Sequence, residues 1–218
     1  YYASVLYIKI ARQLLEAKGL GLSALFKNDA NHPLLEKLHH DNNKLPLTSI
    51  LDLWQEAAEL CSDTVLGLHA GEDCHLTNYG IFAHLLMNCP TIHQALSLMS
   101  QYSYLMNDAL DSSLCVESEV SRYSLEFQST HPAAYHHVEF HFASLVQMGK
   151  QLVSKNDRDL VRPRLMSFSH AAKAPLEVYE KAFESEVLFE QPTNQMIIDN
   201  KVLLLATNAP NEGLYRLL

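Results

Sequence analysis

The chain has 218 residues, of which 48% are hydrophobic and 19% charged, and its 25 acidic and 16 basic side chains give a formal net charge of −9. This composition excludes a disordered chain, and the negative charge without a dense Lys/Arg cluster opposes binding of nucleic acid by this chain itself. The longest apolar run, residues 202–206, is far shorter than the ~20 residues that a membrane span needs, and we expect no signal peptide.

The first half of the chain has the apolar spacing of helices. Apolar residues at steps of three and four predict a helix over residues 2–17, which Gly19 ends. Residues 27–44 are polar and are expected to form a loop around a short helix. Thr48 is the expected N-cap of a second helix over residues 48–62.

The clearest helix signal follows Pro90. A short helix is expected within residues 79–88, because the residue before a proline disfavours helical backbone angles. Thr91 and Gln94 have the spacing of a capping box, and they predict the start of a helix over residues 91–104.

The hydrophobic period changes from 3.6 to 2 after residue 111. Tyr123, Leu125 and Phe127 alternate with polar residues, which predicts an antiparallel hairpin with one buried face. An apolar stripe then predicts a long helix over residues 133–152. Shorter elements are expected beyond it, namely strands at residues 165–170, 187–189 and 196–198 and a helix that begins at Pro175.

The scarcity of turn residues narrows the fold class. Seven glycines and eight prolines are few for this length, whereas a sandwich or jelly roll of many short strands needs frequent turns. We therefore predict an α+β fold, with a helical N-terminal half packed with a small antiparallel sheet and a long helix, and not a jelly roll. Because no linker or internal repeat divides the sequence, residues 1–218 are expected to form a single domain.

The sequence offers little support for catalysis. The densest histidine cluster contains His137 and His141, whose spacing could hold a metal on one helix face, but the HExxH pattern is absent and no third ligand can be assigned. We prefer partly exposed helix histidines, with His141 at the edge of the core. Nucleophile motifs and glycine-rich phosphate loops are also absent, so we predict no enzyme, no catalytic residue, no metal and no cofactor.

Cysteine usage indicates a reducing compartment. The four cysteines are widely spaced and include no CxxC pair; they are Cys61, Cys74, Cys89 and Cys115. An even number permits two disulfides, but a core of this size does not need them. We expect four free thiols, buried or half-buried, in a cytoplasmic protein.

Three blocks of sequence, in order, resemble one known domain. The positions that carry the resemblance are Pro46, Trp54, Gly67, Leu68, Gly80, Pro90, Thr91, Ala95, Leu96, His170, Pro175, Tyr179, Phe183, Phe189, Asn194 and Leu203. The chain resembles the N-terminal effector-sensing domain, often labelled arabinose-binding, of AraC-type bacterial transcriptional regulators. The resemblance implies a cytoplasmic regulator without a membrane segment, which forms a homodimer and binds DNA only through a C-terminal helix-turn-helix domain that is absent from this chain.

Two functions are compatible with this resemblance. The first is an effector-sensing and dimerisation domain that binds a small amphipathic or apolar metabolite and controls an attached DNA-binding domain. The alternative is a protein-interaction and dimerisation domain without a ligand. A closed apolar cavity with a few inward polar groups would favour the first function, and a filled core the second. Arabinose itself is not carried over as the ligand.

If a ligand binds, we expect its site between the helix over residues 133–152 and the hairpin, beneath the helix that starts at Thr91. His141 is a possible partner for a bound carboxylate. The predicted ligand-binding residues are Tyr102, Phe127, Val138, His141, Phe142 and Leu145. The alternative is a close-packed core in which Tyr102 and His141 bond to backbone groups.

Overall fold

The computed structural model describes residues 1–21, 24–25, 44–208 and 210. The helices are α1 (Leu6–Ala17), α3 (Leu47–Cys61), α4 (Leu66–Glu72), α5 (Ile81–Met87), α6 (Ile92–Met106), α7 (Ala134–Leu152), α8 (Leu176–Phe183) and α9 (Asn200–Leu203), with short 3-10 turns η2 (Leu76–Tyr79) and η3 (Arg158–Leu160). The strands are β1 (Tyr2–Ser4), β2 (Lys44–Pro46), β3 (Leu110–Val116), β4 (Val120–Phe127), β5 (Leu165–Ser167), β6 (Glu186–Leu188) and β7 (Asn194–Asp199).

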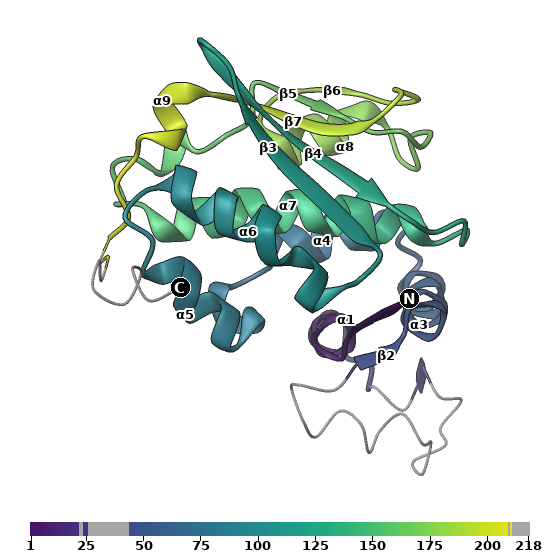
Figure 1. The fold of residues 1–218 in the computed structure, drawn as a ribbon. Helices are drawn as coiled ribbons and strands as arrows, with labels where there is room; N and C mark the ends of the chain where they lie inside the picture. The colour runs from purple at the N-terminus through teal and green to yellow at the C-terminus, as the bar shows by residue number, and fades with distance from the viewer. Residues whose placement is uncertain (22–23, 26–43, 209, 211–218) are drawn as a thin grey trace.

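Five strands form one sheet in the order β3-β4-β7-β5-β6, and only the β5–β6 pair is parallel. Tyr123 pairs with Leu114 on one side and with Met196 on the other. Tyr123, Leu125 and Met196 are buried, which matches the period-2 pattern that predicted the hairpin. The sheet therefore buries one face, and α7 runs beneath it (Figure 1).

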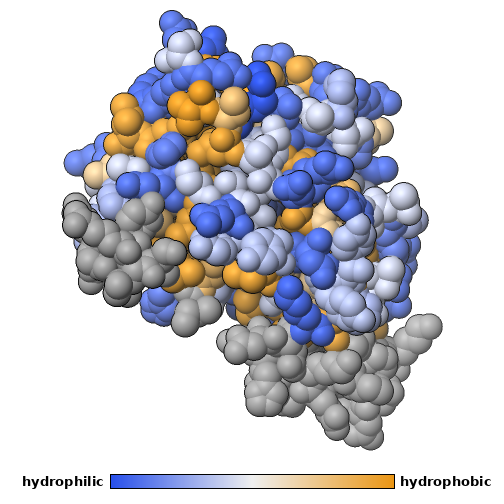
Figure 2. Space-filling model, in the orientation of Figure 1, coloured by the Kyte–Doolittle hydropathy of each residue, from blue (hydrophilic) through white to orange (hydrophobic). Residues whose placement is uncertain are grey.

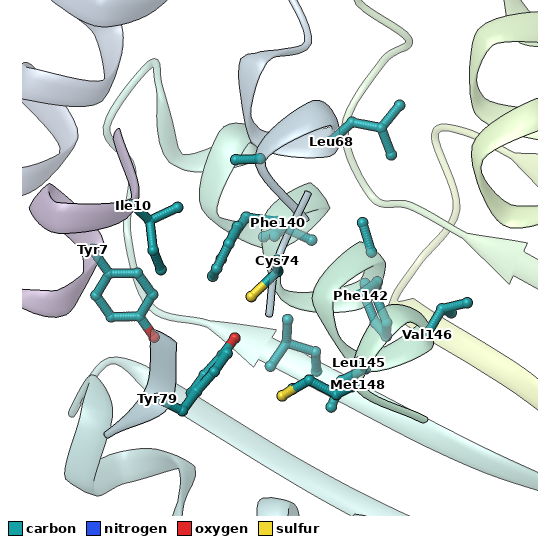
Figure 3. Packing of buried hydrophobic residues seen from close by; sticks show 14 of the residues in the cluster. Tyr7, Ile10, Leu68, Cys74, Tyr79, Phe140, Phe142, Leu145, Val146 and Met148 are labelled. Carbon is teal, nitrogen blue, oxygen red and sulfur yellow. The ribbon is translucent and has the colours of Figure 1, made fainter. Parts of the chain in front are cut away.

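Helix α7 is the centre of the core. Most of its residues are buried, including Phe140 and Phe142 on different sides of the helix. The sheet covers one side of α7, and α4 packs on another (Figure 1). Figure 3 shows how Tyr7 from α1 and Tyr79 from η2 approach the same helix. A helix at such an enclosed position is normally apolar nearly all round, but α7 also buries His136, His137, Glu139 and His141.

The N-terminal helix is shorter than predicted. We expected it over residues 2–17, but α1 begins at Leu6 because Tyr2–Ser4 pairs as β1 with Lys44–Pro46. Strands of three residues are too short to show a hydrophobic period, and their partners lie far apart in the sequence, so the sequence did not predict this pair. The polar loop expected over residues 27–44 lies outside the described residues, except for Lys44 at the start of β2.

The predicted starts of α3 and α6 had different outcomes. Thr48 is not the N-cap of α3, because that helix begins at Leu47 with Pro46 in the cap position. Thr91 is the N-cap of α6, and its hydroxyl oxygen accepts a hydrogen bond from the backbone N–H of Gln94 at 3.4 Å. The Gln94 side chain meets the Thr91 hydroxyl at 2.7 Å rather than the Thr91 backbone, so the capping box is only half formed.

Several later elements also match. The helices expected within residues 79–88 and from Pro175 are α5 and α8, and Pro175 occupies the N-cap of α8. The strand expected over residues 165–170 is shorter, because β5 ends at Ser167.

The fold class predicted from sequence is confirmed. The described part of the chain is α+β, with its helices concentrated in the first half, and it contains no closed barrel. Among these residues, none of the helices is long and apolar enough to cross a membrane. Figure 2 shows a largely hydrophilic surface, with apolar side chains gathered near the position where Figure 1 places α9.

Candidate functional site

An apolar cavity lies between α6, α7 and the buried face of β7. Its volume is about 40 Å³ for the centre of a water-sized sphere. The lining residues come from α5, α6, α7, the segment after η3, β7 and α9; they are Leu86, Ile92, Ala95, Leu96, Met99, Leu145, Val146, Met148, Gly149, Leu152, Val161, Arg162, Pro163, Met196, Ile198 and Val202. Figure 3 shows Leu145, Val146 and Met148 close together on α7.

The lining of this cavity is compatible with an apolar ligand. About 10–15 Å³ measured in this way holds one water molecule, but a void without polar groups offers water no hydrogen-bond partners and tends to stay dry. Met99, Met148 and Met196 reach it from three different elements. Because methionine side chains are unbranched and adapt to irregular shapes, the cavity can widen around a ligand larger than its present volume.

Among the described residues, Arg162 is the one charged residue that lines the cavity. Its side chain is exposed, whereas its neighbours Val161 and Pro163 are buried. The two buried neighbours anchor the segment, and Arg162 is the part of it that is open to solvent. The site thus combines an apolar interior with a cationic edge, as small-molecule sites commonly do.

The structure separates the residues predicted to bind a ligand. Leu145 lines the cavity, and Val138 and Phe142 are buried elsewhere on α7. Tyr102 is half-buried, and its hydroxyl accepts a hydrogen bond from the Gln101 side chain at 3.3 Å.

The two remaining residues of that set meet other rings. Phe127 is half-buried and stacks on His137 with ring centroids 5.0 Å apart. His141 Nε2 and the Tyr123 hydroxyl share a hydrogen bond of 3.1 Å. His141 therefore bonds to a side chain and not to the backbone. Contact of these six residues with a ligand stays a prediction.

Sequence reasoning missed most of the cavity wall. Ile198 and Met196 belonged to a predicted strand, but nothing in the sequence indicated that this strand lies beside α6 and α7. Arg162 lies between Val161 and Pro163 in an irregular segment, and no periodic pattern marks it. The available signals were the apolar stripe of α7, which gave Leu145, and the apolar spacing of α6, which includes Ala95 and Met99.

A second buried group is polar and lies on another side of α7. Glu139 is fully buried, and Tyr179 donates a hydrogen bond to its Oε1 at 2.9 Å. Burial raises the pKa of Glu139 to about 8, although the Tyr179 hydrogen bond and Lys173 oppose the shift. His170 Nε2 lies 3.7 Å from Oε1, and burial lowers the pKa of His170. Both groups are therefore neutral near pH 7 and do not form an ion pair.

The prediction that the histidines of α7 are partly exposed is wrong, because His136, His137 and His141 are buried, and they carry no charge. Burial is the main cause that lowers the pKa of His136 to about 4, of His137 to about 3 and of His141 to about 4. His137 Nε2 meets the Asn107 side-chain nitrogen at 2.9 Å, so this ring nitrogen accepts the bond and the imidazole is neutral. Among the described residues, no group of His, Cys, Asp and Glu side chains could hold a metal ion.

These histidines predict a loss of stability in acid. Because their pKa values in the folded state lie below the unfolded value near 6.5, their contribution to stability is present above pH 6.5 and is lost as pH falls toward 4. Each contributes on the order of 1.4 kcal/mol per pH unit within this window, and Glu139 opposes them as a single group. We expect urea unfolding to give a free energy lower by about 2 kcal/mol or more at pH 5 than at pH 7. An equal or higher value at pH 5 would mean that the rings are not buried as described.

Comparison with known proteins identifies the fold and the family. Residues 34–206 match the family described as the arabinose-binding domain of AraC transcription regulator, N-terminal. A solved structure, that of the transcriptional regulator CdpR from Pseudomonas aeruginosa, matches with a TM-score of 0.70 and 13% sequence identity. The match covers 97% of this chain and 60% of that regulator, so this chain spans less than two thirds of the length of the regulator that it matches. No curated protein sequence matches the chain.

Proposed function

Because the chain belongs to the family of N-terminal arabinose-binding domains of AraC transcription regulators, we propose that it senses a small apolar or amphipathic effector. The observation that supports this function is the cavity between α6, α7 and β7, whose described lining consists of apolar side chains and a single charged residue at the rim. A core without such a void would favour the alternative, an interaction domain without a ligand. In the whole regulator, which we propose acts in the cytoplasm, the sensed signal would control a DNA-binding domain.

The last described residues offer a route by which an effector could act on an attached domain. The backbone of Leu205 accepts a hydrogen bond from Ile92 N at 3.1 Å, at the start of α6. Asn208 N donates to the carbonyl of Leu152 at 2.8 Å, at the end of α7. Ile92 and Leu152 both line the cavity. A ligand that shifts α6 relative to α7 would therefore strain or release this C-terminal segment.

Thr207 strengthens the same connection. Its hydroxyl donates to the carbonyl of Cys89 at 2.6 Å, and its backbone N–H donates to the carbonyl of Pro90 at 3.1 Å. Coupling of this kind requires that the ligand bind one arrangement of these elements better than the other.

Filling the cavity tests this function. Ala95→Val adds two methyl groups at the cavity wall, so we expect unchanged or slightly higher stability and loss of ligand binding. A thermal-shift series with aliphatic alcohols and carboxylates of four to eight carbons should raise the melting temperature of the original chain. A ligand at 100 times its dissociation constant stabilises by about 2.7 kcal/mol, which such an assay detects readily.

The control is Gln101→Val, an exposed position on the same helix. It introduces the same residue into α6 without reaching the cavity, so binding should persist. Binding that survives in both variants would contradict this site, and absence of binding in the original chain would favour the domain without a ligand.

We also propose that the domain forms a homodimer, as the family resemblance implies. Large exposed apolar residues occur in the described structure, among them Tyr104 and Leu105 at the end of α6. The mass in solution decides the point, because a dimer has twice the 24.6 kDa of this chain.

A further inference from the structure

We propose that the effector is a short aliphatic carboxylate whose hydrocarbon part enters the cavity and whose carboxylate pairs with Arg162. This inference deepens the proposed function and rests on it. It names the chemical class of the ligand and assigns the polar contact to a residue outside the helices and strands.

Two hollows meet at Arg162. The first is the apolar cavity, and the second is a polar surface groove. The groove is lined by Asp159, Leu160, Arg162, Pro163, Arg164, Glu184, Ser185, Asp199 and Lys201. Arg162 and Pro163 line both hollows, so a ligand that fills the cavity from the groove has its other end near Arg162.

Arg162 is the groove cation that is available to a ligand. Arg164 and Lys201 both contact Asp199, at 3.8 Å and 3.4 Å. The Arg162 guanidinium, in contrast, makes no ion pair or side-chain hydrogen bond with any residue that the structure describes. A guanidinium presents a fork of N–H donors that fits both oxygens of a carboxylate, and an exposed rim leaves that fork open.

The size of the cavity limits the hydrocarbon part. A volume of about 40 Å³ accommodates a few carbon atoms without rearrangement, and the methionine walls allow modest growth. A branched chain of four to six carbons fits these limits better than a long acyl chain.

Two sources could supply such a carboxylate, namely a plain carboxylic acid and an aliphatic amino acid. Asp159 lines the groove and has no ion-pair partner among the described residues, so it could receive an ammonium group. The carboxylate and Arg162 are common to both sources. The two are distinguished by comparing 4-methylpentanoate with leucine, which has the same skeleton and an added ammonium group.

The test measures binding of 4-methylpentanoate, leucine and 4-methyl-1-pentanol by calorimetry to this chain and to two variants. Arg162→Gln removes the rim cation, and Arg158→Gln removes an exposed arginine that lines neither hollow. We expect Arg162→Gln to weaken carboxylate binding about two- to fivefold and to leave the alcohol unchanged, because Arg162 is exposed and solvent screens its ion pair with the carboxylate. Arg158→Gln should bind all three as the original chain does.

Other outcomes separate the two levels of the proposal. If the alcohol binds as tightly as the carboxylates and Arg162→Gln changes nothing, the carboxylate inference is overturned while the cavity site stands. If none of the three binds, the proposed function itself loses its support. Tighter binding of leucine than of 4-methylpentanoate, with the difference lost in Asp159→Asn, identifies an amino acid as the source and supports the inference.

Discussion

Gly67→Ala should unfold the domain or destabilise it by about 3 kcal/mol or more, because α4 crosses α7 without room for a side chain. A Cβ atom at Gly67 would lie 2.0 Å from the carbonyl oxygen of His136. This oxygen belongs to the backbone of α7, so it cannot move away by a side-chain rotation. Gly67 N also donates to His136 Nδ1 at 3.2 Å, a bond that separation of the helices would break. Helix propensity alone would make alanine more stable than glycine by up to ~1 kcal/mol. The expected loss of stability therefore comes from the close contact between α4 and α7.

The matched control is Gly19→Ala at the end of α1. Gly19 has φ +74°, and a Cβ atom at this position would have no described neighbour within 4 Å. Alanine there should cost only the ~1–2 kcal/mol of a left-handed backbone angle. Urea unfolding of both variants gives the comparison. A smaller loss for Gly67→Ala than for Gly19→Ala would show that α4 and α7 are not packed this closely.

Glu139→Gln should stabilise the domain increasingly as pH rises. The pKa of Glu139 is raised to about 8 by burial, whereas an unfolded glutamate titrates near 4.3. The contribution of Glu139 to stability is therefore fully present below pH 4.3 and declines until pH 8, because folding must neutralise the carboxylate. Glutamine has the same shape and carries no charge, so it avoids this loss.

The neutral amide also keeps the one hydrogen bond that Glu139 makes. Its oxygen can accept the Tyr179 hydroxyl bond that Oε1 accepts now, while Oε2 and His170 Nε2 have no hydrogen-bond partner among the described residues. His170 Nδ1 lies 3.0 Å from the Ala171 carbonyl, so the proton of the neutral ring is on Nδ1 and Nε2 is an acceptor.

Urea unfolding at pH 5, 6, 7 and 8 measures the difference between Glu139→Gln and the original chain. This difference should rise with pH, by up to ~1.4 kcal/mol per unit in the steepest region. The histidine contributions are common to both proteins and cancel. Glu177→Gln, at an exposed position of α8, should give a constant difference. A constant difference for Glu139→Gln as well would mean that its carboxylate is already ionised in the folded protein.

The fold could be predicted to the extent that local periods define it. The period of 3.6 residues located α6 and α7, and the change to a period of 2 located β3 and β4. The pairing of β4 with β7 could not be predicted, because residues 120–125 pair with residues 194–199, and α7 lies between these two strands in the sequence. Strand pairs at such separations depend on tertiary packing rather than on local sequence.

The cavity was harder to predict than the fold for the same reason. Its wall combines segments that are distant in sequence, so only Leu145 of the six predicted residues lies on it. Apolar residues on α6 and α7 indicated burial, but sequence does not distinguish a filled core from one with a void. No hydrophobic period marks Arg162, because it lies in an irregular segment. Its position depends on the buried neighbours Val161 and Pro163.

Methionine-methyl NMR tests most directly whether this cavity binds a ligand. The chain contains six methionines, of which Met99, Met148 and Met196 line the cavity, while Met87, Met106 and Met166 do not. With [methyl-¹³C]methionine-labelled protein, titration of 4-methylpentanoate should move the three cavity signals in a saturable manner and leave the other three in place. Ala95→Val should abolish those shifts. Unchanged cavity signals, or equal shifts of all six methyl groups, would contradict a ligand site between α6, α7 and β7.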